Sequence, residues 1–266
     1  MGILNVTSDS FSDGGKFINV KNAIKQVSKM ILEGASIIDV GGESSRPGAK
    51  RVSEKVEESR VIPIIKEIIK EFNIIVSINT SRQNILTKCI DLGVHMINDI
   101  RSLREFSSLH VISKSDIMIC LMHMRGSPRF MQKKPKYNCI LSEIKKFFEK
   151  KINFLKSKGI SKDRIIIDPG FGFGKTINHN FTLLSNLGKF KSFNIPILVG
   201  MSRKSMTDEN NLFTPESRLS GSISCAILSL IEGASIIRAH DVKETIVAID
   251  IFKKFILAKK NLFYGK

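Results

Sequence analysis

Short apolar runs that end in polar residues recur eight times along the chain. Between them lie longer segments whose apolar residues follow helical spacing, such as Val56, Val61, Ile64, Ile65 and Ile68. This alternation predicts eight strands, each followed by a helix. The predicted strands are residues 2–6, 36–40, 74–78, 96–97, 117–122, 164–167, 197–200 and 235–237.

Alternating strands and helices favour a parallel sheet, and eight units in 266 residues match the usual size of an α/β protein with the (β/α)8 TIM-barrel fold. No linker or abrupt change of composition divides the chain, so we expect one barrel domain over residues 1–266. Such barrels place their chemistry at the C-terminal ends of the strands. The polar residues that end the predicted strands are therefore the candidates for function.

A short internal repeat supports the same architecture. Residues 33–38 (EGASII) recur as residues 232–237, and residues 92–97 are a looser copy. In each copy a glycine closes a helix and a β-branched run begins the next strand, so the repeat is that of a βα unit.

The net charge of +17 changes this picture little. The lysines are spread through the helical segments without interleaved aromatic residues, so we expect a solvated basic surface and no nucleic-acid partner. A positive field would still help to capture an anionic small substrate.

The four cysteines show neither a CxxC pair nor zinc-ligand spacing, which favours reduced thiols and a cytoplasmic location. No run approaches the roughly 20 apolar residues of a membrane span, so no membrane association is expected. Because the first predicted strand begins directly after Met1, we expect either a shortened chain or a start upstream of Met1.

The sharpest local motif is residues 168–175 (DPGFGFGK). Its alternating glycines let the backbone pass close to a flat ligand, Phe171 and Phe173 offer ring faces, and Asp168 adds a carboxylate. It is not a P-loop, since the first glycine of that motif would fall at Pro169. Spacing alone equally supports a tight turn whose aspartate caps local N–H groups.

Asn79 and Asn98 end two other strands, so a barrel would bring both to one mouth with Asp168. Amide and carboxylate groups together suit a heterocycle that has both donors and acceptors. A nitrogen-rich ring is the predicted guest.

A second set of residues at the strand ends suits an anion, because Arg and His⁺ hold phosphate oxygens. Arg238 and His240 could instead cap the last helix as a surface pair, and Arg46 lies in an ordinary loop sequence. Lys204 follows the seventh strand, where it could bind phosphate or a ring carbonyl. The set is Asn5, Ser44, Ser45, Arg46, Arg238 and His240.

Together these residues resemble the dihydropteroate synthase family, folate-pathway enzymes that join 4-aminobenzoate to a pterin diphosphate. The motifs that carry the resemblance occur in order along nearly the whole chain, and their joint occurrence is specific. They are residues 1–7 (MGILNVT), 9–15 (DSFSDGG), 41–48 (GGESSRPG), 168–175, 200–206 (GMSRKSM) and 237–242 (IRAHDV).

The resemblance implies a role for each candidate. Asn98, Asp168 and Lys204 would hold the pterin, with Asn79 where the family normally has aspartate. Asn5 would help to bind Mg²⁺ at the diphosphate, and Arg238 and His240 would hold that diphosphate. Ser45, Arg46, Pro47, Phe173 and Ser205 would shape the aminobenzoate side. Asp168, Lys204 and Arg238 would carry catalysis, in which diphosphate departs with the help of Mg²⁺ and the amine then attacks. A homodimer is also implied.

Two departures from the family pattern matter. The family's Thr-Pro-Asp reads Thr7-Ser8-Asp9 here, which loosens a loop expected to close over the diphosphate. Asn79 keeps the size of aspartate but loses the negative charge that would favour a cationic intermediate. A slower enzyme is therefore expected.

Two other functions fit parts of the pattern. Pterin-binding barrels that transfer a methyl group from methyltetrahydrofolate also use Asn and Asp at strand ends, but they need no diphosphate site, so Arg46, Arg238 and His240 favour the synthase. A non-catalytic or weakened pterin-binding remnant is suggested by Asn79 and by the short N-terminus. The residues that argue against it are Asp168, Lys204 and Arg238.

Overall fold

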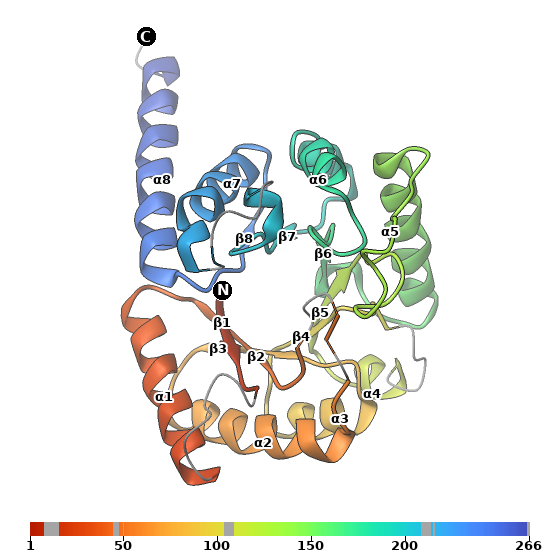
Figure 1. Ribbon diagram of the computed structural model, residues 1–266, viewed down its shortest axis with the longest axis vertical. Coiled ribbons are helices and arrows are strands. Elements are labelled where there is room, and N and C mark those ends of the chain that lie inside the picture. The colour runs from red at the N-terminus through yellow and green to blue at the C-terminus, as the bar shows by residue number, and fades with distance from the viewer. Residues whose placement is uncertain are drawn as a thin grey trace.

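The computed structural model describes residues 1–7, 16–44, 48–49, 51–103, 109–208, 214 and 216–264. Within these residues a ring of parallel strands is surrounded by helices (Figure 1). The strands are β1 (Gly2–Asn5), β2 (Ile37–Gly41), β3 (Ile75–Asn79), β4 (Met96–Asp99), β5 (Met118–Met122), β6 (Ile165–Asp168), β7 (Leu198–Val199) and β8 (Ile236–Ile237). All eight lie where the apolar runs predict them, so the expected (β/α)8 barrel is confirmed.

A helix follows each strand along the chain. The helices are α1 (Lys16–Leu32), α2 (Glu54–Glu71), α3 (Gln83–Asp91), α4 (Leu109–Ser113), α5 (Ile140–Ser157), α6 (Ile177–Leu184), α7 (Leu219–Ile231) and α8 (Val242–Tyr264). Short 3-10 helices lie in the connections, namely η3 (Lys162–Arg164), η4 (Leu187–Phe193), η5 (Ser205–Thr207) and η6 (Glu216–Arg218). No helix in the described ranges combines the length and apolarity needed to cross a membrane.

The strands pair in sequence order around the ring. β1 to β6 form one parallel sheet and β7 pairs with β8. Single parallel bridges join these two groups, Ile167 with Ile197 and Gly2 with Ala239. The second bridge closes the ring, because Ile3 N donates to Ala239 O at 3.1 Å and Ala239 N donates to Met1 O at 3.0 Å. All the strand C-termini therefore open at one mouth.

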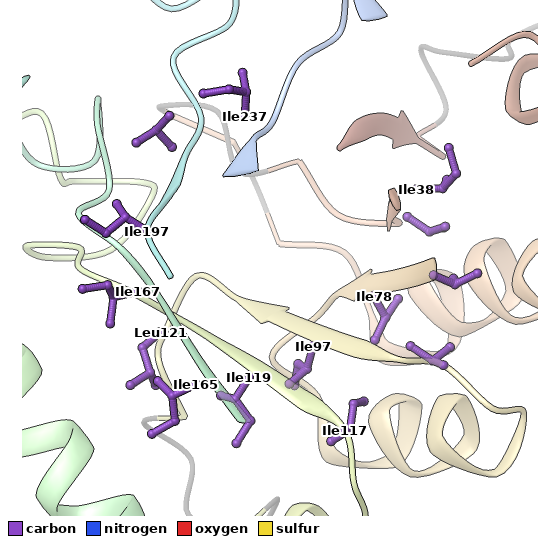
Figure 2. Packing of buried hydrophobic residues seen from close by; sticks show 14 of the residues in the cluster. Ile38, Ile78, Ile97, Ile117, Ile119, Leu121, Ile165, Ile167, Ile197 and Ile237 are labelled. Carbon is purple, nitrogen blue, oxygen red and sulfur yellow. The ribbon is translucent and has the colours of Figure 1, made fainter. Parts of the chain in front are cut away.

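Alternate side chains of each strand point outward and inward. The outward ones, such as Ile78, Ile119 and Ile167, belong to the large apolar cluster between the strands and the helices (Figure 2). Inward ones such as Cys120 and Ile166 form a smaller cluster with Met96 and Leu198. Further along the strands the inward positions become polar, and this change defines the floor of the mouth.

The repeated sequence 33–38 marks the join between a helix and the next strand, as predicted. Gly34, Gly93 and Gly233 follow α1, α3 and α7, and each has a positive φ, between 91° and 100°. Such angles strain any residue with a Cβ, so glycine lets the chain leave the helix and enter the strand within a few residues.

Candidate active site

Polar side chains occupy the inward positions at the mouth of the barrel. Asn5, Gly41 and Asn79 are direct partners across β1, β2 and β3. Because the middle position is glycine, no side chain separates the two asparagines. Neither amide makes a side-chain hydrogen bond within the described residues, so both are available to a ligand.

Asp39 is the centre of a buried polar network, although it is not among the residues predicted for the site. Its Oδ1 accepts from Ser77 Oγ at 2.6 Å, and its Oδ2 accepts from Asn98 Nδ2 at 3.1 Å and from Arg238 Nε at 2.7 Å. Its side chain is fully buried, whereas that of Arg238 is 19% exposed. Asp39 thus joins an amide of the predicted heterocycle site to a guanidinium of the predicted anion site.

Asp99 follows Asn98 in the chain but serves another purpose. It points the other way from β4, where its carboxylate accepts from Arg101 N at 2.8 Å and from Leu103 N at 2.7 Å. Alternation along the strand thus separates a residue that faces the mouth from one that caps the loop behind it.

Asp168 ends β6 and begins the glycine loop, which we define as residues 169–174. Its Oδ1 accepts from Gly170 N at 2.7 Å. One of the two carboxylate oxygens therefore caps a local N–H group, as the tight-turn interpretation predicts. Burial raises the pKa of Asp168, an effect that Lys204 partly offsets. Gly170 has φ 72°, and a Cβ there would lie 1.9 Å from His123 O, so the loop needs glycine at this point.

Lys204 reaches across from the β7 side onto the glycine loop. Its Nζ donates to Phe171 O and lies 4.4 Å from the centre of the Phe173 ring. A Cβ on Gly172 would lie 2.9 Å from Lys204 Cδ, so this glycine makes room for the lysine stem. Burial lowers the pKa of Lys204 to about 8, although Asp168 acts in the opposite direction.

Arg238 and His240 lie just beyond β8 on the rim of the mouth. His240 is tied to Ser202, since Ser202 Oγ lies 3.1 Å from His240 Nδ1 and accepts from His240 N at 3.2 Å. Arg203 forms a two-point ion pair with Asp241, at 2.6 and 3.1 Å. These contacts hold the connections after β7 and β8 together. The Nη atoms of Arg238 make no hydrogen bond among the described residues, so they remain open to an anion.

The remaining predicted residues are those expected to shape the aminobenzoate side. Phe173 is buried in the glycine loop, and Ser205 is exposed at the start of η5. Ser45, Arg46 and Pro47 lie outside the described residues.

The described residues contain no group of three or more His, Cys, Asp or Glu side chains that could hold a metal ion. Asn5 offers a single amide oxygen. Magnesium commonly takes one or two protein ligands and completes its shell with phosphate oxygens and water. The residues present therefore fit an ion that arrives with a diphosphate rather than one held by the protein alone.

Comparison with known proteins decides the family. The family described as "Pterin binding enzyme" matches residues 1–240. A dihydropteroate synthase of Escherichia coli strain K12 is 47% identical over 264 residues, which are 99% of this chain and 94% of the relative. The chain belongs to the dihydropteroate synthase family of pterin-binding enzymes.

Solved structures of dihydropteroate synthases share the fold. The Yersinia pestis enzyme in complex with a sulfonamide drug has a TM-score of 0.91 and 45% identity, with 96% of this chain and 93% of that chain covered. The Xanthomonas albilineans enzyme with 4-aminobenzoic acid has a TM-score of 0.90 and 36% identity, with 96% and 92% covered. As a member of the dihydropteroate synthase family, the protein is a pterin-binding transferase of folate biosynthesis.

Proposed function

We propose that the enzyme condenses 6-hydroxymethyl-7,8-dihydropterin diphosphate with 4-aminobenzoate to give 7,8-dihydropteroate and diphosphate. One observation carries this proposal. A single buried carboxylate, Asp39, bonds both to Asn98 on the amide floor and to Arg238 on the cationic rim. The two sites are therefore adjacent, as a ligand requires when one end is a nitrogen-rich ring and the other an anion.

The pterin would lie on the floor of the mouth. Its ring N–H and amino groups are donors that suit the Asp168 carboxylate, and its ring acceptors suit the amides of Asn98 and Asn79. Lys204 would donate to the ring carbonyl. A cation that is already aligned by Phe171 O and the Phe173 ring needs little reorganisation to do so.

The diphosphate would lie on the rim. Arg238 keeps its Nε on Asp39 and directs its Nη donors to phosphate oxygens, while His240 is held by Ser202. Asn5 would supply a protein ligand to a Mg²⁺ ion that accompanies the diphosphate. When bound, this ion would neutralise charge on the departing oxygens.

The reaction breaks the bond between the pterin methylene carbon and the diphosphate oxygen, and the electron pair leaves with diphosphate. Arg238 stabilises the negative charge that develops on that oxygen. The methylene keeps positive charge, which spreads into the ring beside the Asp168 carboxylate. The amine of 4-aminobenzoate then forms the C–N bond and releases one proton. Asp168, Lys204 and Arg238 are the catalytic residues of this proposal.

The aminobenzoate would bind between the glycine loop and the start of η5, against Phe173 and Ser205. Ser45, Arg46 and Pro47 would complete that side. Support comes from the Xanthomonas albilineans relative, whose structure contains 4-aminobenzoic acid.

We also infer that the barrel, residues 1–266, acts as one cytoplasmic domain and forms a homodimer. α7 and α8 lie side by side (Figure 1) and expose large apolar side chains, for example Ile231 at 56%, Ile251 at 64% and Phe255 at 62%. A patch of this kind is typical of an interface between subunits. Ile251→Lys should convert the dimer to monomer in sedimentation equilibrium, whereas Lys253→Glu, on the same exposed helix, should leave it dimeric. A wild-type monomer would contradict the proposal.

The function is tested by supplying the pterin diphosphate, 4-aminobenzoate and Mg²⁺ and by measuring pyrophosphate and dihydropteroate together. Equal amounts of both products, dependent on the amine, are expected. Arg238→Met should lose activity, and Lys253→Met, an exposed lysine on α8, is the matched control. Tight pterin binding without either product would indicate a non-catalytic remnant. Failure to bind pyrophosphate would favour the methyltransferase chemistry.

A further inference from the structure

A buried lysine, Lys175, directly follows the glycine loop in the chain, and the proposed reaction does not use it. Its side chain is almost fully buried. Its Nζ lies 2.7 Å from Gly170 O, 3.1 Å from Phe173 O and 3.3 Å from His123 O, and it is 3.1 Å from His123 Nδ1. Burial lowers its pKa to about 7, and Asp168 opposes that shift. Burial of an amino group costs free energy unless hydrogen bonds compensate it, and these acceptors provide that compensation.

Side chains bind the carbonyl groups of residues 170–174 in the glycine loop. From Gly170 to Gly174, each of the five backbone oxygens accepts from a side-chain donor. Lys175 takes the first and fourth, Lys204 the second, Gln132 the third at 2.6 Å, and Tyr137 the last at 2.9 Å. The shape of the loop therefore depends on these donors.

The donors differ in their access to water. Gln132 is exposed and Tyr137 is half-buried, so water can replace their hydrogen bonds. Lys175 is enclosed, and without it the Phe173 carbonyl would lose its donor and the Gly170 carbonyl would keep only its backbone donor. These two oxygens belong to one turn, since Phe173 N donates to Gly170 O at 3.1 Å.

The two lysines bind different groups of the same turn. Lys204 contacts Phe171 O and the face of the Phe173 ring. Lys175 binds Gly170 O and Phe173 O, and it also joins the loop to His123 beyond β5. A shift of the turn would move both contacts of Lys204 at once.

We propose that Lys175 is a positioning residue for the pterin side of the site. By fixing the turn from Gly170 to Phe173, Lys175 positions the Phe171 carbonyl and the Phe173 ring. These two groups in turn align Lys204. This inference rests on the proposed pterin pocket. It assigns no role to Lys175 in binding the diphosphate, because Arg238 and His240 are held by Asp39 and Ser202 instead.

The test compares two ligands on the same variants. In Lys175→Met, which keeps the length of the side chain but removes its donors, the affinity for 6-hydroxymethylpterin should fall roughly tenfold or more by calorimetry. The affinity for pyrophosphate with Mg²⁺ should stay within about threefold of wild type. Lys133→Met, an exposed lysine in the connection before α5, is the matched control and should change neither.

Chemical rescue separates positioning from general damage to the fold. In Lys175→Ala, added methylammonium should restore pterin affinity, whereas tetramethylammonium, which has the same charge but no N–H donor, should not. Equal losses of pterin and pyrophosphate affinity, or no loss of either, would overturn the proposal. So would a failure of both variants to fold even with methylammonium. If the wild-type protein itself does not bind the pterin, the proposed function fails instead.

Discussion

Replacement of Asp39 by asparagine should separate the charge of this residue from its shape. The amide can place its oxygen at the Oδ2 position, where Asn98 and Arg238 both donate, and its NH₂ group toward Ser77 Oγ, which can accept. All three contacts are then kept and only the negative charge is lost. The charge-assisted bond from Arg238, at 2.7 Å, is the contact that weakens most.

The magnitude follows from this contact. Hydrogen bonds to charged groups contribute about 1.5–3 kcal/mol. Arg238 is 19% exposed, so water compensates part of the loss, and Asp39→Asn should lower the free energy of unfolding by about 1–2 kcal/mol. Asp39→Ala breaks the whole network and leaves the guanidinium without its carboxylate, which should cost about 3–5 kcal/mol.

The effect on activity should be larger than the effect on stability. Arg238 would no longer be oriented by a fixed carboxylate, so kcat/KM for the pterin diphosphate should fall roughly tenfold to hundredfold. Urea denaturation and pyrophosphate release measure the two quantities. Ser77→Ala is the control: it removes one neutral donor to Oδ1, and activity should change by less than about threefold. Wild-type kcat/KM in Asp39→Asn, or an equal loss in Ser77→Ala, would refute the reasoning.

Three further predictions follow. Asn79→Asp should raise kcat roughly tenfold to hundredfold, because a carboxylate stabilises the pterin cation by about 1.5–3 kcal/mol; an unchanged kcat in pyrophosphate release would show that this charge is dispensable. Burial lowers the pKa of Lys204 to about 8, and in the proposed complex its ammonium form donates to the pterin carbonyl, so kcat/KM should fall as pH rises above about 8. In Lys204→Arg that decline should disappear from the pH profile, and its persistence would assign it to another group. Gly170→Ala should destabilise the fold by about 3 kcal/mol or more in urea denaturation, because its Cβ meets His123 O at 1.9 Å and φ is 72°; a wild-type midpoint would contradict this.

The strands and their polar ends could be predicted from the sequence because both depend on local patterns. An apolar run followed by Asn79, Asn98 or Asp168 already indicates a strand that opens at the mouth. The period of two along a strand also distinguishes Asn98 from its neighbour Asp99.

Asp39 has no predicted role in the site, although it is the polar residue of the second predicted strand and the sequence contains a further signal for it. A carboxylate between Ile38 and Val40 in a central parallel strand is buried, and a buried charge requires partners. Which partners it has could not be read from the chain. Lys175 gave no such signal, because its burial depends on His123, 52 positions earlier, and on the path of the glycine loop.

The bridge between Gly2 and Ala239 has a consequence for synthesis of the protein. A ribosome exposes β1 to β6 well before β8 is complete, so the nascent chain must exist as an open sheet with two free edges. During that interval Asp39 lacks Arg238, its partner 199 positions later. Closure of the ring therefore supplies a long-range contact of the fold and the guanidinium of the site in one step. Fragments that end before β8 should need a chaperone to stay in solution, and the enzyme should become active only when its last strand is in place.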